Sequence, residues 1–219
     1  MSETETLRAD DVAQYLEQHP EFFIEHSQLL TRIQVPHPRG TGAIPLSERQ
    51  VLSLREQNRA LENKLAELIQ FGEENDDISQ RVHRLAVDLM AGSPLSALIE
   101  CCCRAVRDDF GVPHAAVRLW RGSGESEAFA ETSEELRNFA AALPRPFCGP
   151  NDNFEAVAWF GEAAALVRSV AFIPLRDAGE TIGLLAMGSE DPERFYADMG
   201  TLYLERIGEL VSAALLREL

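Results

Sequence analysis

The chain has little of what marks proteins that bind nucleic acid or anionic membranes. Lys64 is the only lysine among 219 residues, and acidic residues outnumber basic ones by 36 to 20, for a net charge of −16. The excess is spread over the chain, with −4 in residues 1–46, −3 in 47–91 and −9 in 92–219. Binding to duplex DNA and to anionic lipid both depend on basic side chains that neutralise phosphates. We therefore expect no membrane partner and no direct binding to nucleic acid.

Long apolar runs are also missing. No stretch approaches the roughly 20 apolar residues that a membrane-spanning helix needs. The first residues, MSETETLRADD, lack the basic and apolar regions of a secretory signal. We therefore expect a cytoplasmic protein.

Cysteine is sparse and badly spaced for disulfides or zinc. Cys101, Cys102 and Cys103 are consecutive, and Cys148 stands alone, so there is no CxxC pair and no disulfide framework. The histidines make no metal-ligand spacing, and no Ser-His-Asp or paired-carboxylate arrangement can be argued. The sequence thus predicts a reducing compartment, no metal site and no catalytic residue.

The first segment, residues 1–46, is predicted to be helical. Val12, Tyr15 and Leu16 have helical spacing, and Pro20 ends that helix and begins the next. Residues 35–42, VPHPRGTG, interrupt regular structure and predict a linker or an exposed loop.

Residues 47–91 carry the clearest periodic signal and are predicted to form a coiled-coil or linker helix. Apolar residues recur at alternating intervals of three and four, with one asparagine at an a position: Val51, Leu54, Asn58, Leu61, Leu65 and Leu68. An asparagine there fixes the register of a parallel two-stranded coil. These six residues, which we call the seam, are the predicted homodimer interface. The alternative is that the helix packs on its own domain.

The seam loses its phase at Gly72 and the acidic run 73–77. A shift of this kind locally unwinds or overwinds a coil. The segment could equally mark a break in the helix, a hinge or a solvated turn.

Residues 92–219 are predicted to form an α+β domain. Residues 115–120 alternate as a half-buried strand does, and the apolar runs 169–175 and 181–187 enclose a hairpin turn. Residues 127–130 suggest a short strand and 144–150 a rigid loop. A terminal helix is expected to open at Asp191-Pro192.

Two resemblances extend this interpretation. The segments SVAFIPL (169–175), IGLLA (182–186) and DPERF (191–195) resemble the C-terminal half of GAF domains, the sensory fold related to PAS. HPEFF (19–23), VPH (35–37) and SERQV (47–51) resemble a bacterial family, domain of unknown function 484, over nearly the whole chain. The resemblance implies a GAF/PAS-like antiparallel sheet flanked by helices, following the helical arm and the coiled-coil helix.

A ligand pocket in such a domain would lie between the sheet and the segments that cross it. We select six residues for it: Arg118, Trp120, Phe147, Cys148, Trp159 and Phe160. A guanidinium in an apolar cavity favours an anionic or carbonyl ligand, although all six residues could equally be ordinary core.

We therefore expect a homodimeric sensory or protein-interaction module, in which a small-molecule ligand or a protein partner shifts the helical arm. The ligand, any cofactor and the protein partner are not identified by the sequence. Two alternatives stand beside it. One is a scaffold whose pocket is filled by its own side chains. The other is a thiol enzyme of the free methionine sulfoxide reductase type, with Cys148 reactive.

Overall fold

The structure, a computed structural model, describes residues 8–36 and 43–219. The chain divides into two compact units, Met1–Phe71 and Gly72–Leu219. Among the described residues, no helix is both long enough and apolar enough to cross a bilayer.

The first unit consists of short helices, a strand pair and the start of a long helix. The helices are α1 (Ala9–Gln18), α2 (Phe22–Glu25) and α3 (Gln28–Arg32), and they agree with the prediction for this segment. Strands β1 (Gln34–Pro36) and β2 (Ala43–Pro45) pair antiparallel. The predicted linker, residues 35–42, thus begins within β1, and its residues 37–42, with His37 and Arg39, lie outside the described residues.

Helix α4 runs from Leu46 to Ala91 in one piece. The expectation of a break or turn at Gly72–Asp77 is therefore wrong. Acidic side chains within the run make intrahelical contacts that favour the helix, such as Asp76 with Gln80 and Asp77 with Arg81, each pair four residues apart. A single glycine costs a helix only about 1 kcal/mol, which such a long helix tolerates.

The second unit is built on one antiparallel sheet of four strands in the order β3-β6-β5-β4. Strands β5 (Ser169–Asp177) and β6 (Glu180–Ser189) form the predicted hairpin in the centre. Strand β3 (His114–Leu119) pairs with β6 on one side, and β4 (Phe147–Pro150) with β5 on the other. Both central strands are buried along most of their length, as expected for a sheet covered on both faces.

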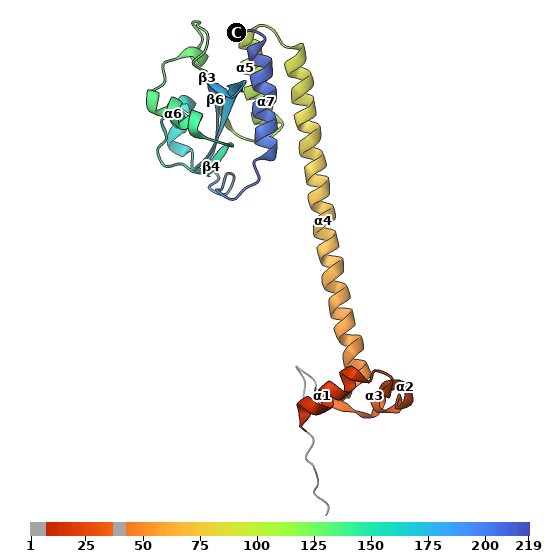
Figure 1. Ribbon diagram of the computed structural model, residues 1–219. Coiled ribbons are helices and arrows are strands. Elements are labelled where there is room, and N and C mark those ends of the chain that lie inside the picture. Colours follow the sequence, from red (N-terminus) through yellow and green to blue (C-terminus); the bar gives the residue numbers. More distant parts are fainter. Residues whose placement is uncertain (1–7, 37–42) are drawn as a thin grey trace, which may run out of the picture. The chain divides into compact units, whose positions relative to one another are not determined.

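Helices α5 (Leu95–Asp108) and α7 (Leu202–Leu216) cover one face of the sheet. The C-terminal part of α4 packs on the same side through Val82, Leu85 and Leu89. Helix α6 (Glu134–Ala142) and the 3-10 segment η2 (Glu155–Leu166) cover the other face. Figure 1 shows α5 and α7 on one side of the strands and α6 on the opposite side. The α+β class predicted from the sequence is confirmed.

Three local predictions are wrong, each for a local reason. Phe147–Pro150 is a strand, because an edge strand tolerates the prolines that suggested a loop. Residues 127–129 form the 3-10 turn η1 (Glu127–Phe129), in which the Ser126 hydroxyl accepts from the Ala128 N–H. Helix α7 starts at Leu202, since the Asp191 side chain accepts from the Glu193 N–H and closes a turn.

Candidate functional site

Arg118 and Trp159 form a cation–π contact on the face covered by η2 and α6. Arg118 lies on β3, and its guanidinium stacks over the Trp159 ring, 5.3 Å from the ring centroid. The Arg118 side chain is only 12% exposed, while the Glu127 carboxylate lies 3.8 Å away and is 91% exposed. Its one hydrogen bond among the described residues is a long one, 3.4 Å, to the Val117 carbonyl. A nearly buried guanidinium is therefore held by loose contacts and keeps donors to spare.

Trp120 continues the same row at the end of β3. Its indole N–H donates to the Thr181 carbonyl at 2.7 Å, and the Arg137 guanidinium lies 6.0 Å from its ring centroid. Arg137 is in turn held by the buried Thr132 hydroxyl at 2.9 Å. Helix α6 is thereby tied to the sheet beside Arg118.

Four phenylalanines fill the other end of this face. Phe147 stacks on Phe172 with ring centroids 5.9 Å apart, and Phe139 and Phe154 contact both. The Phe172 side chain is fully buried. The half of the face nearest β4 is thus packed with aromatic rings.

Phe160 covers β6 where the strand carries Gly188. A Cβ at Gly188 would come within 2.7 Å of the Phe160 ring, so only glycine admits the ring this close. Next to it, the Nε2 atom of His114 is buried without a hydrogen bond from the described residues. The nearest carboxylate oxygen, of Glu190, lies 3.7 Å away.

The structure brings five of the six predicted pocket residues to this face and separates the sixth. Cys148 packs into the hydrophobic cluster on the opposite face, with α7. Neighbouring residues of a strand point to opposite sides of a sheet. Phe147 and Cys148 are neighbours on β4, so they do not line one pocket.

The four thiols are free, and Cys101, Cys102 and Cys148 are buried while Cys103 is partly buried. Burial raises the pKa of Cys148 to about 11 and also raises the pKa values of Cys101, Cys102 and Cys103. Thiols held protonated are poor nucleophiles. Moreover, α5 packs over β3, whereas Cys148 lies on β4. These two strands are at opposite edges of the sheet and about 14 Å apart, at ~4.8 Å per strand spacing. That separation prevents Cys148 from forming a disulfide with the α5 cysteines.

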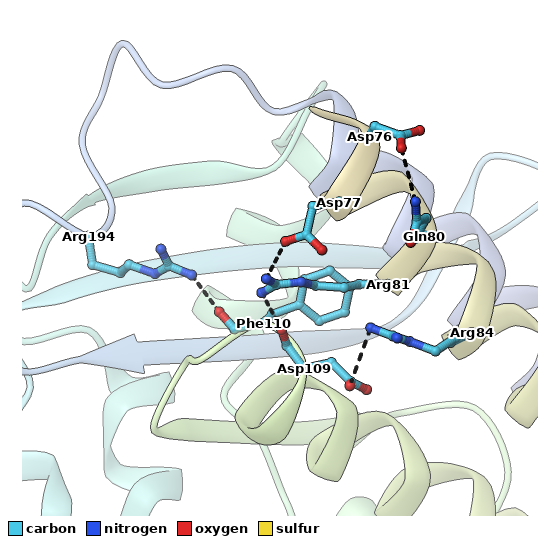
Figure 2. Close-up of polar contacts among 8 residues, drawn as sticks. All are labelled: Asp76, Asp77, Gln80, Arg81, Arg84, Asp109, Phe110 and Arg194. Carbon is cyan, nitrogen blue, oxygen red and sulfur yellow. Dashed lines mark hydrogen bonds and ion pairs between the residues drawn. The ribbon is translucent and has the colours of Figure 1, made fainter. Parts of the chain in front are cut away.

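A second polar cluster, absent from the predicted site, surrounds the C-terminal end of α5. Arg81 of α4 donates to the Asp109 carbonyl at 2.6 Å and pairs with Asp77. From the other side, Arg194 donates to the Phe110 carbonyl at 2.6 Å. Figure 2 shows the two guanidinium groups converging on this turn. Two cations thus stabilise the carbonyls at a helix C-terminus. Phe110 and Arg194 are 84 positions apart, so no local sequence pattern indicates this pairing.

The model of the family described as "Protein of unknown function, DUF484" matches residues 2–217 of the chain. A protein of Shigella flexneri, named YigA and described as uncharacterized, is 31% identical over 216 residues. That alignment covers 94% of this chain and 90% of the relative.

Among solved structures, the chain is similar to the GAF domain of A. aeolicus nlh2 in an inactive state. The TM-score is 0.47 and the identity 16%, over 66% of this chain and 99% of that one. A free methionine-R-sulfoxide reductase from Neisseria meningitidis matches with a TM-score of 0.45 and 16% identity, over 64% of this chain and 89% of that one. Likeness at this level carries nothing about ligand or activity.

Proposed function

The chain belongs to the DUF484 family, and we propose that it is a regulatory or docking module that dimerises through the seam on α4. The observation that carries this proposal is the exposure of the seam. Its apolar members Val51, Leu54, Leu61, Leu65 and Leu68 are between 47% and 66% exposed. Soluble proteins seldom leave such a continuous apolar row exposed to water. We infer that the seam is buried against the seam of a second copy of the chain.

The spacing of the seam fits a parallel pair of helices. Five apolar residues and Asn58 occupy successive a and d positions, and Asn58 would meet its counterpart across a parallel dimer. The flanking residues offer no like-charged pair, since each position g would face position e of the partner's next heptad. These pairs would be Gln50 with Arg55, Gln57 with Glu62, and Lys64 with Ile69.

The apolar stripe of α4 changes partner near Gly72. After Phe71 the buried positions are Val82, Leu85 and Leu89, which pack on α5 and α7. We propose that the helix therefore belongs to the dimer in its first half and to the α/β domain in its second. A change in the domain would then be transmitted along one continuous helix, by a shift between two packing arrangements. In this proposal the predicted boundaries at residues 46/47 and 91/92 mark the ends of the helix, which is shared between the dimer and the domain.

The first unit also supports a docking role. None of its described side chains is buried, and Tyr15 and Ile24 are 51% and 81% exposed. Ordering a segment costs conformational entropy, which burial of its apolar side chains normally offsets. Since this unit leaves them exposed, a partner that buries them would stabilise it. A protein partner for this unit belongs to the proposal, as does a cytoplasmic location, which the free thiols favour.

A ligand at Arg118 and Trp159 is the second candidate. The nearly buried guanidinium with loose contacts favours an anionic or carbonyl group as a partner for its remaining donors. The aromatic packing around Phe172 favours instead the scaffold whose face is filled by its own side chains. The hypothesis of a sulfoxide reductase has the least support, because the thiols are buried and held protonated.

The test of the dimer is a double substitution, Leu54→Asp with Leu61→Asp. Sedimentation equilibrium of the wild type should give twice the chain mass of 24.3 kDa, and the variant should give that mass once. The matched control is Ser53→Asp with Ala60→Asp, which adds the same charge one residue earlier, at position c of the heptad. A control that stays dimeric supports the seam. A wild type of single mass, or a variant of double mass, would refute it.

A further inference from the structure

A cavity of about 390 Å³ lies where α4 meets the domain. This volume is within the ~300–1,000 Å³ typical of small-molecule sites. It is on the opposite side of the sheet from Arg118, since its floor belongs to the hydrophobic cluster under α5 and α7. Its walls come from α4, the turn after α5, β6, the segment before α7, and α7 itself.

The floor of the cavity is apolar. Val112, Met187, Phe195 and Ile207 line it, each 3% exposed or less. The walls add side chains that are partly buried and so can pack closer against an occupant: Ile78, Phe110, Met199, Tyr203 and Leu204. A Cβ at Gly200, also in the lining, would meet no atom within 4 Å. The interior therefore suits a hydrocarbon or aromatic body.

Arg194 supplies a cation to this cavity. One Nη of its guanidinium donates to the Phe110 carbonyl, and its Cζ lies 5.9 Å from the Phe195 ring centroid. Among the described residues no carboxylate lies within ion-pair distance of it. The second arginine of the lining, Arg81, is already paired with Asp77. Arg194 is thus the cation with free donors, and a planar guanidinium matches a carboxylate.

The two acids of the lining limit the charge of the occupant. Glu74 and Asp77 both stand on the α4 wall, and the chain as a whole carries −16. Like charges repel, and the repulsion grows with the charge of the occupant. A doubly charged phosphate is therefore disfavoured relative to a single carboxylate.

We propose that this cavity binds a monocarboxylic acid with an apolar body, whose carboxylate pairs with Arg194 and whose body lies on Met187, Phe195 and Ile207. The site is independent of the dimer, because all its residues belong to Gly72–Leu219. Its occupant would touch α4 at Ile78 and α7 at Leu204 at the same time. Binding would thus stabilise the packing of α4 on the domain.

The probes are sodium octanoate, octyl phosphate and 1-octanol, titrated into the full chain by calorimetry. Octanoate should bind more tightly than octyl phosphate, and Arg194→Gln should weaken octanoate by about tenfold, the effect of losing a charged hydrogen bond. The same change should leave octanol unaffected. Arg168→Gln is the matched control, an exposed arginine outside the cavity, and should bind octanoate as the wild type does.

Hydrogen exchange locates the site. Octanoate should slow amide exchange in residues 74–81 and 203–207, the α4 and α7 walls. The proposal fails if octanoate does not bind at millimolar concentration, if Arg194→Gln binds it as tightly as the wild type, or if protection falls elsewhere. Preference for octyl phosphate would equally overturn the assignment of a carboxylate.

Discussion

The phenol of Tyr203 on α7 donates to the carbonyl oxygen of Asn75 on α4 at 2.9 Å, and it lies 3.0 Å from the Ser79 hydroxyl. These contacts join residues that are 128 and 124 positions apart in the sequence. They sit where α4 stops presenting its seam and begins to pack on the domain. Tyr203 therefore links α4 to α7 through polar contacts of its hydroxyl.

Replacing Tyr203 with phenylalanine should weaken the attachment of α4 to α7. The ring would stay in place while the hydroxyl is lost, and a hydrogen bond of this kind contributes about 0.5–1.5 kcal/mol to stability. Urea unfolding should show a loss in that range. Tyr196→Phe is the control, because Tyr196 is 55% exposed, and it should change little. Equal effects of the two substitutions would mean that the Tyr203 hydroxyl contributes nothing.

Gly208→Ala should destabilise the packing of α7 on the sheet. The added Cβ would lie 2.6 Å from the Ile173 Cγ2 atom on β5, closer than atoms can pack. Overpacking of a core costs about 1–3 kcal/mol, and chemical unfolding should show a loss of this size. Gly72→Ala should do the opposite and gain about 0.5–1 kcal/mol from helix propensity, since its Cβ meets no atom within 4 Å. If Gly208→Ala were as stable as the wild type, α7 would have to be free to move away from β5.

The Cys148 thiol should make stability depend on alkaline pH. Its pKa rises from 9.0 to about 11 on folding, because burial disfavours the thiolate. The unfolded chain releases the proton first, so the contribution is complete below pH 9 and is lost as the pH rises toward 11. Unfolding of wild type and Cys148→Ala should therefore show a difference that shrinks over this range. A difference independent of pH would mean that the thiol is not desolvated.

Asn58→Leu should strengthen the proposed dimer while relaxing its register. An asparagine at an a position lowers stability in exchange for fixing alignment and strand number. The variant should melt at a higher temperature and include species larger than a dimer in light scattering. Asn63→Leu, at the outward f position of the heptad, is the control and should leave the oligomeric state unchanged. A variant that melts lower would argue against a seam with Asn58 inside it.

Local patterns in the chain were enough to predict much of the domain. Alternation at residues 115–120 and the paired apolar runs around Asp177–Glu180 correctly indicated β3 and the β5–β6 hairpin. These elements show in the sequence because each satisfies its own periodicity. Strand β4 could not be recognised in this way, since Phe147–Pro150 becomes a strand only by pairing with Ser169–Phe172. The start of α7 was missed for a local reason, because a turn at Asp191 delays the helix to Leu202.

The chain by itself determined its organisation: a helix with an apolar seam, an α+β domain behind it, and an acidic surface without basic patches. Each of these depends on composition or on spacing within a few turns of one element. Only the tertiary structure separated Phe147 from Cys148 on opposite faces, brought Arg81 and Arg194 to the end of α5, and assembled a cavity from five distant segments. The physical reason is that burial and pairing are set by partners far away in the sequence, which no local periodicity encodes.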